Sequence, residues 1–140
     1  MRILIVKLGA IGDIIHTLPA LTAIRRAFPA AEIGWVAEMR SAEILRGHPA
    51  IDSLIEIDTK QWRSELKAGQ FFSGVGKQLS GLRRANYEIA IDFQGLLKSA
   101  AIAKASGASQ RWGFSRKDLR EPASRVFFND VVSIPPQTHV

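Results

Sequence analysis

The chain has 140 residues, of which 46% are hydrophobic, and it contains no cysteine. This length suits a single globular domain with one substantial core. The lack of cysteine excludes disulfides, thiolate catalysis and cysteine-based zinc sites, and the three histidines, His16, His48 and His139, are too scattered to suggest a metal cluster. The apolar runs fall short of the roughly 20 residues that a membrane-spanning helix needs, and the N-terminus shows no signal-peptide pattern. We therefore expect a soluble cytoplasmic protein.

The net charge of +6 is concentrated in the second part of the sequence. Residues 1–59 carry 6 basic and 7 acidic side chains, whereas residues 60–140 carry 13 basic and 6 acidic ones. A nucleic acid, an anionic membrane surface or a phosphorylated substrate could bind such a basic face. The alternative is a basic surface that is exposed to solvent and has no partner. Because no RNA-binding or DNA-binding motif accompanies the charge, no specific nucleic-acid partner is expected.

Apolar periodicity predicts strands and helices that alternate along the chain. Strands are predicted over residues 2–7, 32–38, 53–57, 87–92 and 110–114, and the first and fourth of these have the apolar character typical of buried strands. Helical spacing covers residues 14–28, 41–46, 96–105 and 121–128. The segment 60–87 is predicted to be helical in places and interrupted by Gly69, Gly74 and Gly76. This order predicts an α/β domain with a Rossmann-like, doubly wound and mostly parallel sheet.

The turn between the first strand and the first helix places Asp13 where α/β proteins bind ligands. One interpretation is structural, because Asp is a preferred N-cap residue. A second is nucleotide binding: Gly9 and Gly12 match the last two glycines of G-x-G-x-x-G, and Glu38 ends the next strand where a ribose-binding acid would lie. Lys7 replaces the first glycine, however, and Asp13 would repel a pyrophosphate.

Three sequence blocks resemble the bacterial heptosyltransferases of glycosyltransferase family 9. The first runs from Lys7 to Leu21 (KLGAIGDIIHTLPAL), the second from Asp92 to Ala100 (DFQGLLKSA), and the third is Arg120-Glu121-Pro122. The resemblance implies the N-terminal, acceptor-binding lobe of a GT-B enzyme over residues 1–140. It also implies a C-terminal nucleotide-sugar domain, which is absent from this chain. Without that domain the chain is expected to bind acceptor but not to catalyse transfer.

The reaction that the resemblance implies is transfer of heptose, with inversion, from ADP-L-glycero-D-manno-heptose to a Kdo residue of the lipopolysaccharide inner core. No cofactor and no metal are expected. The implied partners are a lipid-linked Kdo acceptor, the cytoplasmic face of the inner membrane of a Gram-negative bacterium, and the C-terminal domain. The alternative function is a nucleotide-binding Rossmann module of a dehydrogenase or regulator.

On this resemblance Asp13 is the general base, a role that suits the proton loss of an attacking sugar hydroxyl. Arg120 and Lys98 are candidates for binding acceptor carboxylates or phosphates, although Arg120 could instead pair with Asp118 or Glu121. Lys7 could stabilise a pyrophosphate, pair with Asp13 or simply extend its amine to solvent at a strand end. The complete set of expected substrate-binding residues is Lys7, Gly9, Gly12, His16, Trp62, Arg63, Gln94, Gly95, Lys98 and Arg120.

Basic residues are interleaved with aromatic ones from Lys60 to Arg84, a composition that suits a lipid headgroup surface. Trp62 and Arg63 begin this segment, and Phe71 and Phe72 lie in its middle. The alternative is one amphipathic helix that buries both phenylalanines in the core.

Overall fold

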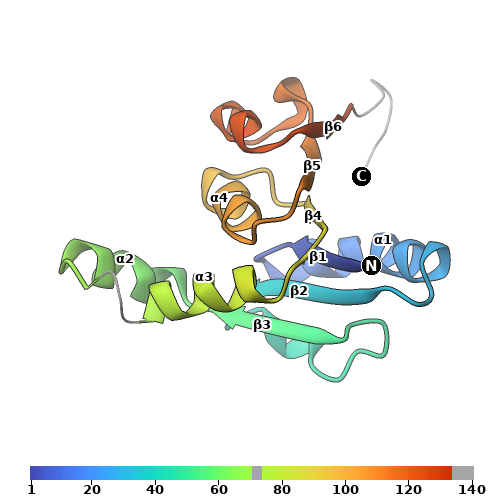
Figure 1. Cartoon of the computed structure of the whole chain (residues 1–140), viewed down its shortest axis with the longest axis horizontal. Helices are drawn as coiled ribbons and strands as arrows, with labels where there is room; N and C mark the ends of the chain where they lie inside the picture. Colours follow the sequence, from blue (N-terminus) through green and yellow to red (C-terminus); the bar gives the residue numbers. More distant parts are fainter. Residues whose placement is uncertain (71–73, 134–140) are drawn as a thin grey trace.

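A parallel sheet of six strands forms the centre of the computed structural model, which describes residues 1–70 and 74–133 (Figure 1). The strand order is β3-β2-β1-β4-β5-β6, and every neighbouring pair is parallel. From β1 the chain adds strands on one side as far as β3, and it then returns to add β4, β5 and β6 on the other side, as in doubly wound dinucleotide-binding folds. The place between β1 and β4 is the switch point of the sheet. The predicted fold class is confirmed. The strands are β1 (Arg2–Val6), β2 (Glu32–Glu38), β3 (Ser53–Ile57), β4 (Ile89–Asp92), β5 (Gln110–Phe114) and β6 (Asp130–Val132).

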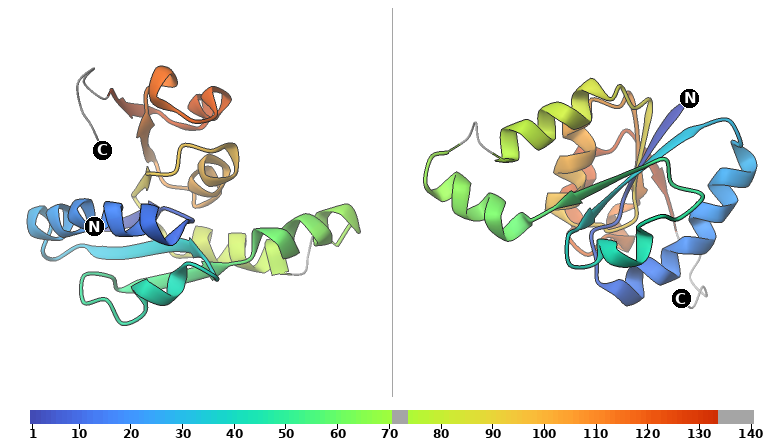
Figure 2. Two further views of the ribbon diagram at one scale, coloured as in Figure 1. Left: turned by 180° about the vertical axis from the view of Figure 1, so that it is seen from behind. Right: turned by 90° about the horizontal axis from the view of Figure 1, so that it is seen from below.

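Helices cover both faces of the sheet (Figure 2). On one face α1 (Ile11–Ala27) buries Ile14 and Leu21 against side chains of β1 and β2. On the other face α3 (Gly74–Arg84) and α4 (Leu97–Ala105) bury Leu82 and Ile102 against β1, β2 and β4. Because β1 and β2 each contribute alternate side chains to the two clusters, both faces are apolar, as a parallel sheet requires.

Residues 60–84 form two helices in the described part of the chain, which confirms the prediction of a segment that is helical in places. Helix α2 (Thr59–Lys67) begins after Asp58, whose side chain accepts hydrogen bonds from the amides of Lys60 and Gln61. Gly69 follows its end, and Gly74 lies at the start of α3 instead of interrupting a helix. Phe71 and Phe72, for which the sequence suggests a core or membrane position, lie outside the described residues.

Other differences concern short elements. Strand β6, which extends the sheet beyond β5, was not predicted because its three residues give too little alternation to detect. The predicted helices 41–46 and 121–128 are 3-10 turns, η1 (Ala42–Leu45) and η3 (Pro122–Phe127), and a further one, η2, covers Arg116–Asp118. Each is too short to establish repeated α-helical hydrogen bonds.

The carboxyl ends of β1 and β4 lie side by side, with Val6 opposite Asp92 in the sheet register. The chain leaves β1 toward α1 on one face and β4 toward α4 on the other. Loops that diverge in this way leave a crevice at the sheet edge, which is where ligands bind in open α/β folds.

Candidate active site

The turn after β4 is organised by the buried carboxylate of Asp92, which is 1% exposed. Its Oδ1 accepts hydrogen bonds from the amides of Gln94 (2.7 Å) and Gly95 (3.2 Å), and its Oδ2 accepts one from the Ser99 hydroxyl (2.9 Å). Gly95 has a φ of +73°, a conformation that disfavours a residue with a Cβ. Although these hydrogen bonds favour the ionised form, burial outweighs them and raises the pKa of Asp92 to about 6.

Gln94 connects this turn to the turn after β1. Its side chain is 7% exposed, and its Oε1 accepts hydrogen bonds from the amides of Leu8 (3.2 Å) and Gly9 (3.5 Å). The two predicted motifs, Lys7 to Asp13 and Asp92 to Gly95, are therefore one hydrogen-bonded unit at the sheet switch point.

The third block, Arg120-Glu121-Pro122, is bonded to the same unit. The amide of Glu121 donates to the Gly95 carbonyl (3.1 Å), and the Glu121 carboxylate accepts from the amide of Leu97 (2.7 Å), the first residue of α4. Glu121 thus anchors the loop that carries Arg120 beside the Gln94 turn.

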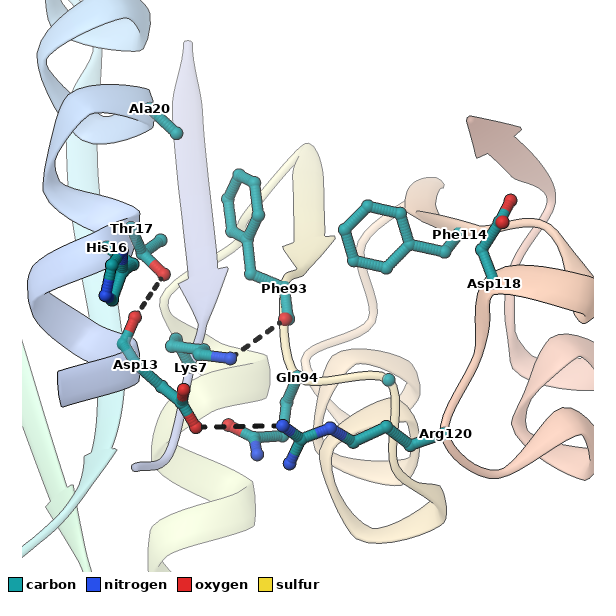
Figure 3. A pocket seen from close by; sticks show the side chains of 11 residues that line it. Lys7, Asp13, His16, Thr17, Ala20, Phe93, Gln94, Phe114, Asp118 and Arg120 are labelled. Atoms are coloured by element: carbon teal, nitrogen blue, oxygen red, sulfur yellow. Dashed lines mark hydrogen bonds and ion pairs between the residues drawn. The ribbon is translucent and has the colours of Figure 1, made fainter. Parts of the chain in front are cut away.

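Asp13 and Arg120 face each other across a cavity of about 460 Å³ (Figure 3). Arg120 Nη2 lies 3.9 Å from Asp13 Oδ2, with side-chain exposures of 63% and 40%. The cavity is lined by Lys7, Asp13, His16, Thr17, Ala20, Phe93, Gln94, Gly95, Phe114, Asp118 and Arg120. Among the predicted site residues the structure brings six together here: Lys7, Asp13, His16, Gln94, Gly95 and Arg120.

The N-cap interpretation of Asp13 is wrong. Helix α1 begins at Ile11, and its N-cap is Ala10, so Asp13 is the third helical residue. It nevertheless lies in the first turn, where the helix dipole favours a negative charge. The carboxylate points into the cavity toward Arg120 (Figure 3), leaving it available to a ligand.

Lys7 directly follows β1 and is 8% exposed, so the interpretation of a solvent-extended lysine is also wrong. Its Nζ donates to the carbonyl of Phe93 (3.2 Å). Burial lowers the pKa of Lys7, while the nearby charges of Asp13 and Asp92 oppose that shift. The lining of the cavity thus combines two cations, Lys7 and Arg120, with two acids, Asp13 and Asp118.

A second cavity, of about 750 Å³, lies on the other side of Gln94 and contains the remaining glycine-turn residues. Gly9, Gly12, Arg63 and Lys98 line it, together with Arg40 and Lys60. A Cβ at Gly9 would lie 2.8 Å from the Ser41 hydroxyl, whereas one at Gly12 would meet nothing within 4 Å. A side chain at Gly9 would therefore displace the Ser41 hydroxyl, while Gly12 leaves the start of α1 open toward the cavity.

Glu38 is the acid at the end of β2 that a dinucleotide site would direct to a ribose. Its carboxylate accepts hydrogen bonds from the amide and hydroxyl of Thr59, and it lies 4.0 Å from Lys98 Nζ. These contacts give Glu38 a structural role at the start of α2, and they do not favour the nucleotide-binding alternative.

Trp62 and Arg63 lie on α2, away from Asp13, and line a third cavity between α2, α3 and α4. Arg63 and Lys98 line both this cavity and the second one. The predicted residues therefore occupy three neighbouring cavities instead of one site.

Asp92 and Glu121 are two residues of the site that were not predicted from the sequence. Both belong to the three family blocks, and the signal that would have identified Asp92 is an acid at the end of a buried strand, immediately before a glycine turn. Within the described ranges no cluster of three or more acidic or histidine side chains is arranged to hold a metal ion.

Comparison with known proteins agrees with the sequence blocks. The sequence model of glycosyltransferase family 9 (heptosyltransferase) matches residues 75–140. Lipopolysaccharide heptosyltransferase 1 of Escherichia coli K12 is 34% identical over 139 residues, which are 99% of this chain. The chain belongs to glycosyltransferase family 9.

The family relationship extends to a second organism and to solved structures. Lipopolysaccharide heptosyltransferase 1 of Pseudomonas aeruginosa is 38% identical over 91% of this chain. The structure of E. coli heptosyltransferase WaaC with ADP-2-deoxy-2-fluoro heptose matches 99% of the chain with a TM-score of 0.87 and 34% identity. The chain spans 36% and 44% of the lengths of these two curated relatives and 44% of the WaaC chain.

None of the helices in residues 1–70 and 74–133 has both the length and the apolar character that crossing a membrane requires.

Proposed function

We propose that this chain is the acceptor-binding lobe of an inverting heptosyltransferase that acts on the lipopolysaccharide inner core. The observation that carries the proposal is the position of Asp13, which faces Arg120 across the cavity at the switch point of a family 9 fold. Relatives named lipopolysaccharide heptosyltransferase 1 support the reaction class. The similarity to E. coli WaaC, whose structure holds ADP-2-deoxy-2-fluoro heptose, supports an ADP-heptose donor.

In the proposed reaction the Asp13 carboxylate accepts the proton of an acceptor hydroxyl. The hydroxyl oxygen then bonds to the anomeric carbon of the heptose from the face opposite the diphosphate. The bond between the anomeric carbon and the phosphate oxygen breaks, and ADP leaves with the electron pair. The configuration at the anomeric carbon is inverted because a single displacement occurs. This scheme uses no cofactor and no metal.

The cations around Asp13 have two roles in this scheme. Arg120, with its planar and exposed guanidinium, binds a carboxylate of a Kdo acceptor and holds the attacking sugar beside Asp13. Lys7 is buried and held by the Phe93 carbonyl, so it supplies a fixed positive charge under the site. His16, exposed on the same side of α1, contacts the acceptor from the cavity wall.

The second cavity receives the phosphorylated parts of the substrates. Its cations, Arg40, Lys60, Arg63 and Lys98, outnumber its one acid, Glu38, among the described lining residues. The exposed start of α1 at Gly12 adds backbone amides and the positive end of the helix dipole. The basic side chains on α2 and α3 would also favour an anionic membrane surface, at the cytoplasmic face of the inner membrane.

A calorimetric titration tests the binding part of this proposal. The ligand is a de-acylated, phosphorylated Kdo disaccharide, with NAD as the parallel ligand and Arg120→Ala as the variant. Saturable binding of the acceptor, weakened in the variant, is the expected result. Binding of NAD without binding of the acceptor would instead support the nucleotide-binding alternative.

A further inference from the structure

An apolar groove is lined by residues of α2, α3 and α4. Its floor consists of Trp62, Leu66, Val75, Leu79, Ala101 and Ile102, and its volume is about 560 Å³. This volume lies within the range of about 300–1,000 Å³ that is usual for small-molecule sites. Helix α2 has no buried residue, and Leu66, which is 45% exposed, leaves apolar surface open to a ligand.

Cations border this groove. Arg63 and Lys67 extend from α2, and Lys98 extends from the first turn of α4. The described residues that line the groove include no acid. An apolar floor with a basic margin is complementary to an amphiphile whose polar end is anionic.

The groove is continuous with the second cavity, because Thr59, Arg63 and Lys98 line both. That cavity in turn meets the Asp13 cavity at Gln94, which lines both of those. The chain thus presents a sugar-sized cavity with an acid, a cationic cavity and an apolar groove in succession. Figure 1 shows α2 and the adjoining end of α3 extending past the end of β3.

We propose that the groove between α2, α3 and α4 binds one acyl chain of the lipid-linked acceptor. This inference rests on the proposed function and adds a subsite to it. The acceptor sugar lies beside Asp13, its anionic groups lie among Arg63, Lys98 and their neighbours, and an acyl chain packs against Trp62 and Leu66. The favourable free energy of this contact comes from removing the methylenes of the chain from water.

Fluorescence quenching of Trp62 tests this arrangement without requiring catalysis. The indole of Trp62 is half-buried in the groove wall, where its Nε1 donates to Gln78 Oε1 (2.7 Å). An acceptor with brominated acyl chains is titrated into the full-length enzyme, and Trp62→Phe identifies the contribution of this tryptophan. We expect quenching that saturates and that is missing in Trp62→Phe.

Leu66→Asp is the groove variant, and Val126→Asp is its matched control, because Val126 is 73% exposed and lies on η3 outside the groove. Leu66→Asp should remove the Trp62 quenching and raise KM for the acylated acceptor about tenfold, a cost of about 1.4 kcal/mol. KM for the de-acylated acceptor should stay unchanged, and Val126→Asp should change neither KM.

Two results would overturn the acyl-chain site: an equal rise of both KM values in Leu66→Asp, or equal quenching by brominated phospholipid vesicles that lack the acceptor. Failure of the proposed function gives a different pattern. Quenching by the brominated acceptor without heptose transfer to either acceptor would refute the reaction and retain the groove. Transfer without quenching would refute the groove alone.

Discussion

Asp13 on the first helix and Arg120 on the loop before η3 are 107 positions apart in sequence, and their side chains meet at 3.9 Å across the cavity. Both are substantially exposed, and an exposed ion pair contributes at most about 1 kcal/mol to stability. Stability alone therefore gives little reason for this pairing. The pair instead places an acid and a cation next to each other in the lining of one cavity, where both can contact the same ligand.

Asp13→Asn should reduce the transfer rate by roughly 10²–10⁴-fold, because the amide cannot accept the hydroxyl proton. The free energy of unfolding should change by less than about 1 kcal/mol. Single-turnover kinetics and urea denaturation of the full-length enzyme measure the two effects. Glu43→Gln, an exposed acid outside the three cavities, serves as the control. A rate within a few-fold of the wild type would exclude Asp13 as the base.

Arg120→Ala should chiefly raise KM for the acceptor, while Arg120→Lys should recover only part of the loss. A lysine keeps the charge but cannot form the bidentate contact of a guanidinium with a carboxylate. Steady-state kinetics at varied acceptor concentration provide the measurement. Equal KM values for Arg120→Ala and the wild type would show that Arg120 does not contact the acceptor.

Gln94→Leu should lower the free energy of unfolding by about 1–3 kcal/mol, because the amides of Leu8 and Gly9 would lose their acceptor. Gln61→Leu is the comparison, since Gln61 is exposed and its side chain donates to the carboxylate of Glu65 at the protein surface. Surface changes of this kind usually stay within about 0.5 kcal/mol. Equal effects in urea denaturation would contradict the bridging role of Gln94.

Asp92→Asn should alter the pH dependence of stability. The pKa of Asp92 is raised from its ordinary value of 3.8 to about 6, so the folded state binds more protons between these values and becomes less stable as the pH rises through them. A shift of about two units corresponds to about 3 kcal/mol. The asparagine variant lacks this loss, so its stability relative to wild type should increase from about pH 4 to about pH 7. Parallel profiles in denaturation measured across this range would refute the assignment.

Gly12→Ala should increase the stability of α1 and weaken the binding of the ADP-sugar. The added methyl meets nothing within 4 Å, and alanine favours helices over glycine by up to about 1 kcal/mol. The methyl projects beside the second cavity, so the affinity for the ADP-sugar should fall. Gly81→Ala on α3, also unobstructed, should increase stability without changing that affinity. An unchanged donor KM in Gly12→Ala would place the phosphates elsewhere.

The sequence predicted five of the six strands of the sheet. The ranges 32–38, 53–57 and 110–114 agree with β2, β3 and β5, and the ranges 2–7 and 87–92 contain β1 and β4. Burial on both faces gives β1 a continuous apolar run, which makes it easy to detect. The three-residue edge strand β6 gave no comparable pattern. The N-cap assignment of Asp13 failed because the preceding turn residues carry no distinct local signal for where α1 begins.

Distances within the site were beyond sequence reasoning for a different reason. Local patterns place Lys98 at the start of a helix, but only the sheet order places it beside Glu38 and apart from Asp13. The same holds for Arg120, for which the sequence offers Asp118 and Glu121 as nearby partners. Glu121 instead accepts from Leu97, and Ser115 donates to Asp118, while Arg120 reaches Asp13.

The bonds that join Gln94 to Leu8 and Gly9, and Glu121 to Gly95 and Leu97, also determine how the molecule would open locally. Segments tied in this way exchange their amide hydrogens in one cooperative event. The amides of Gly9, Gly95 and Leu97 should then share a single protection factor. Helix α2, without a buried residue, should exchange separately and faster, so that local opening of α2 would leave the hydrogen bonds around Gln94 intact.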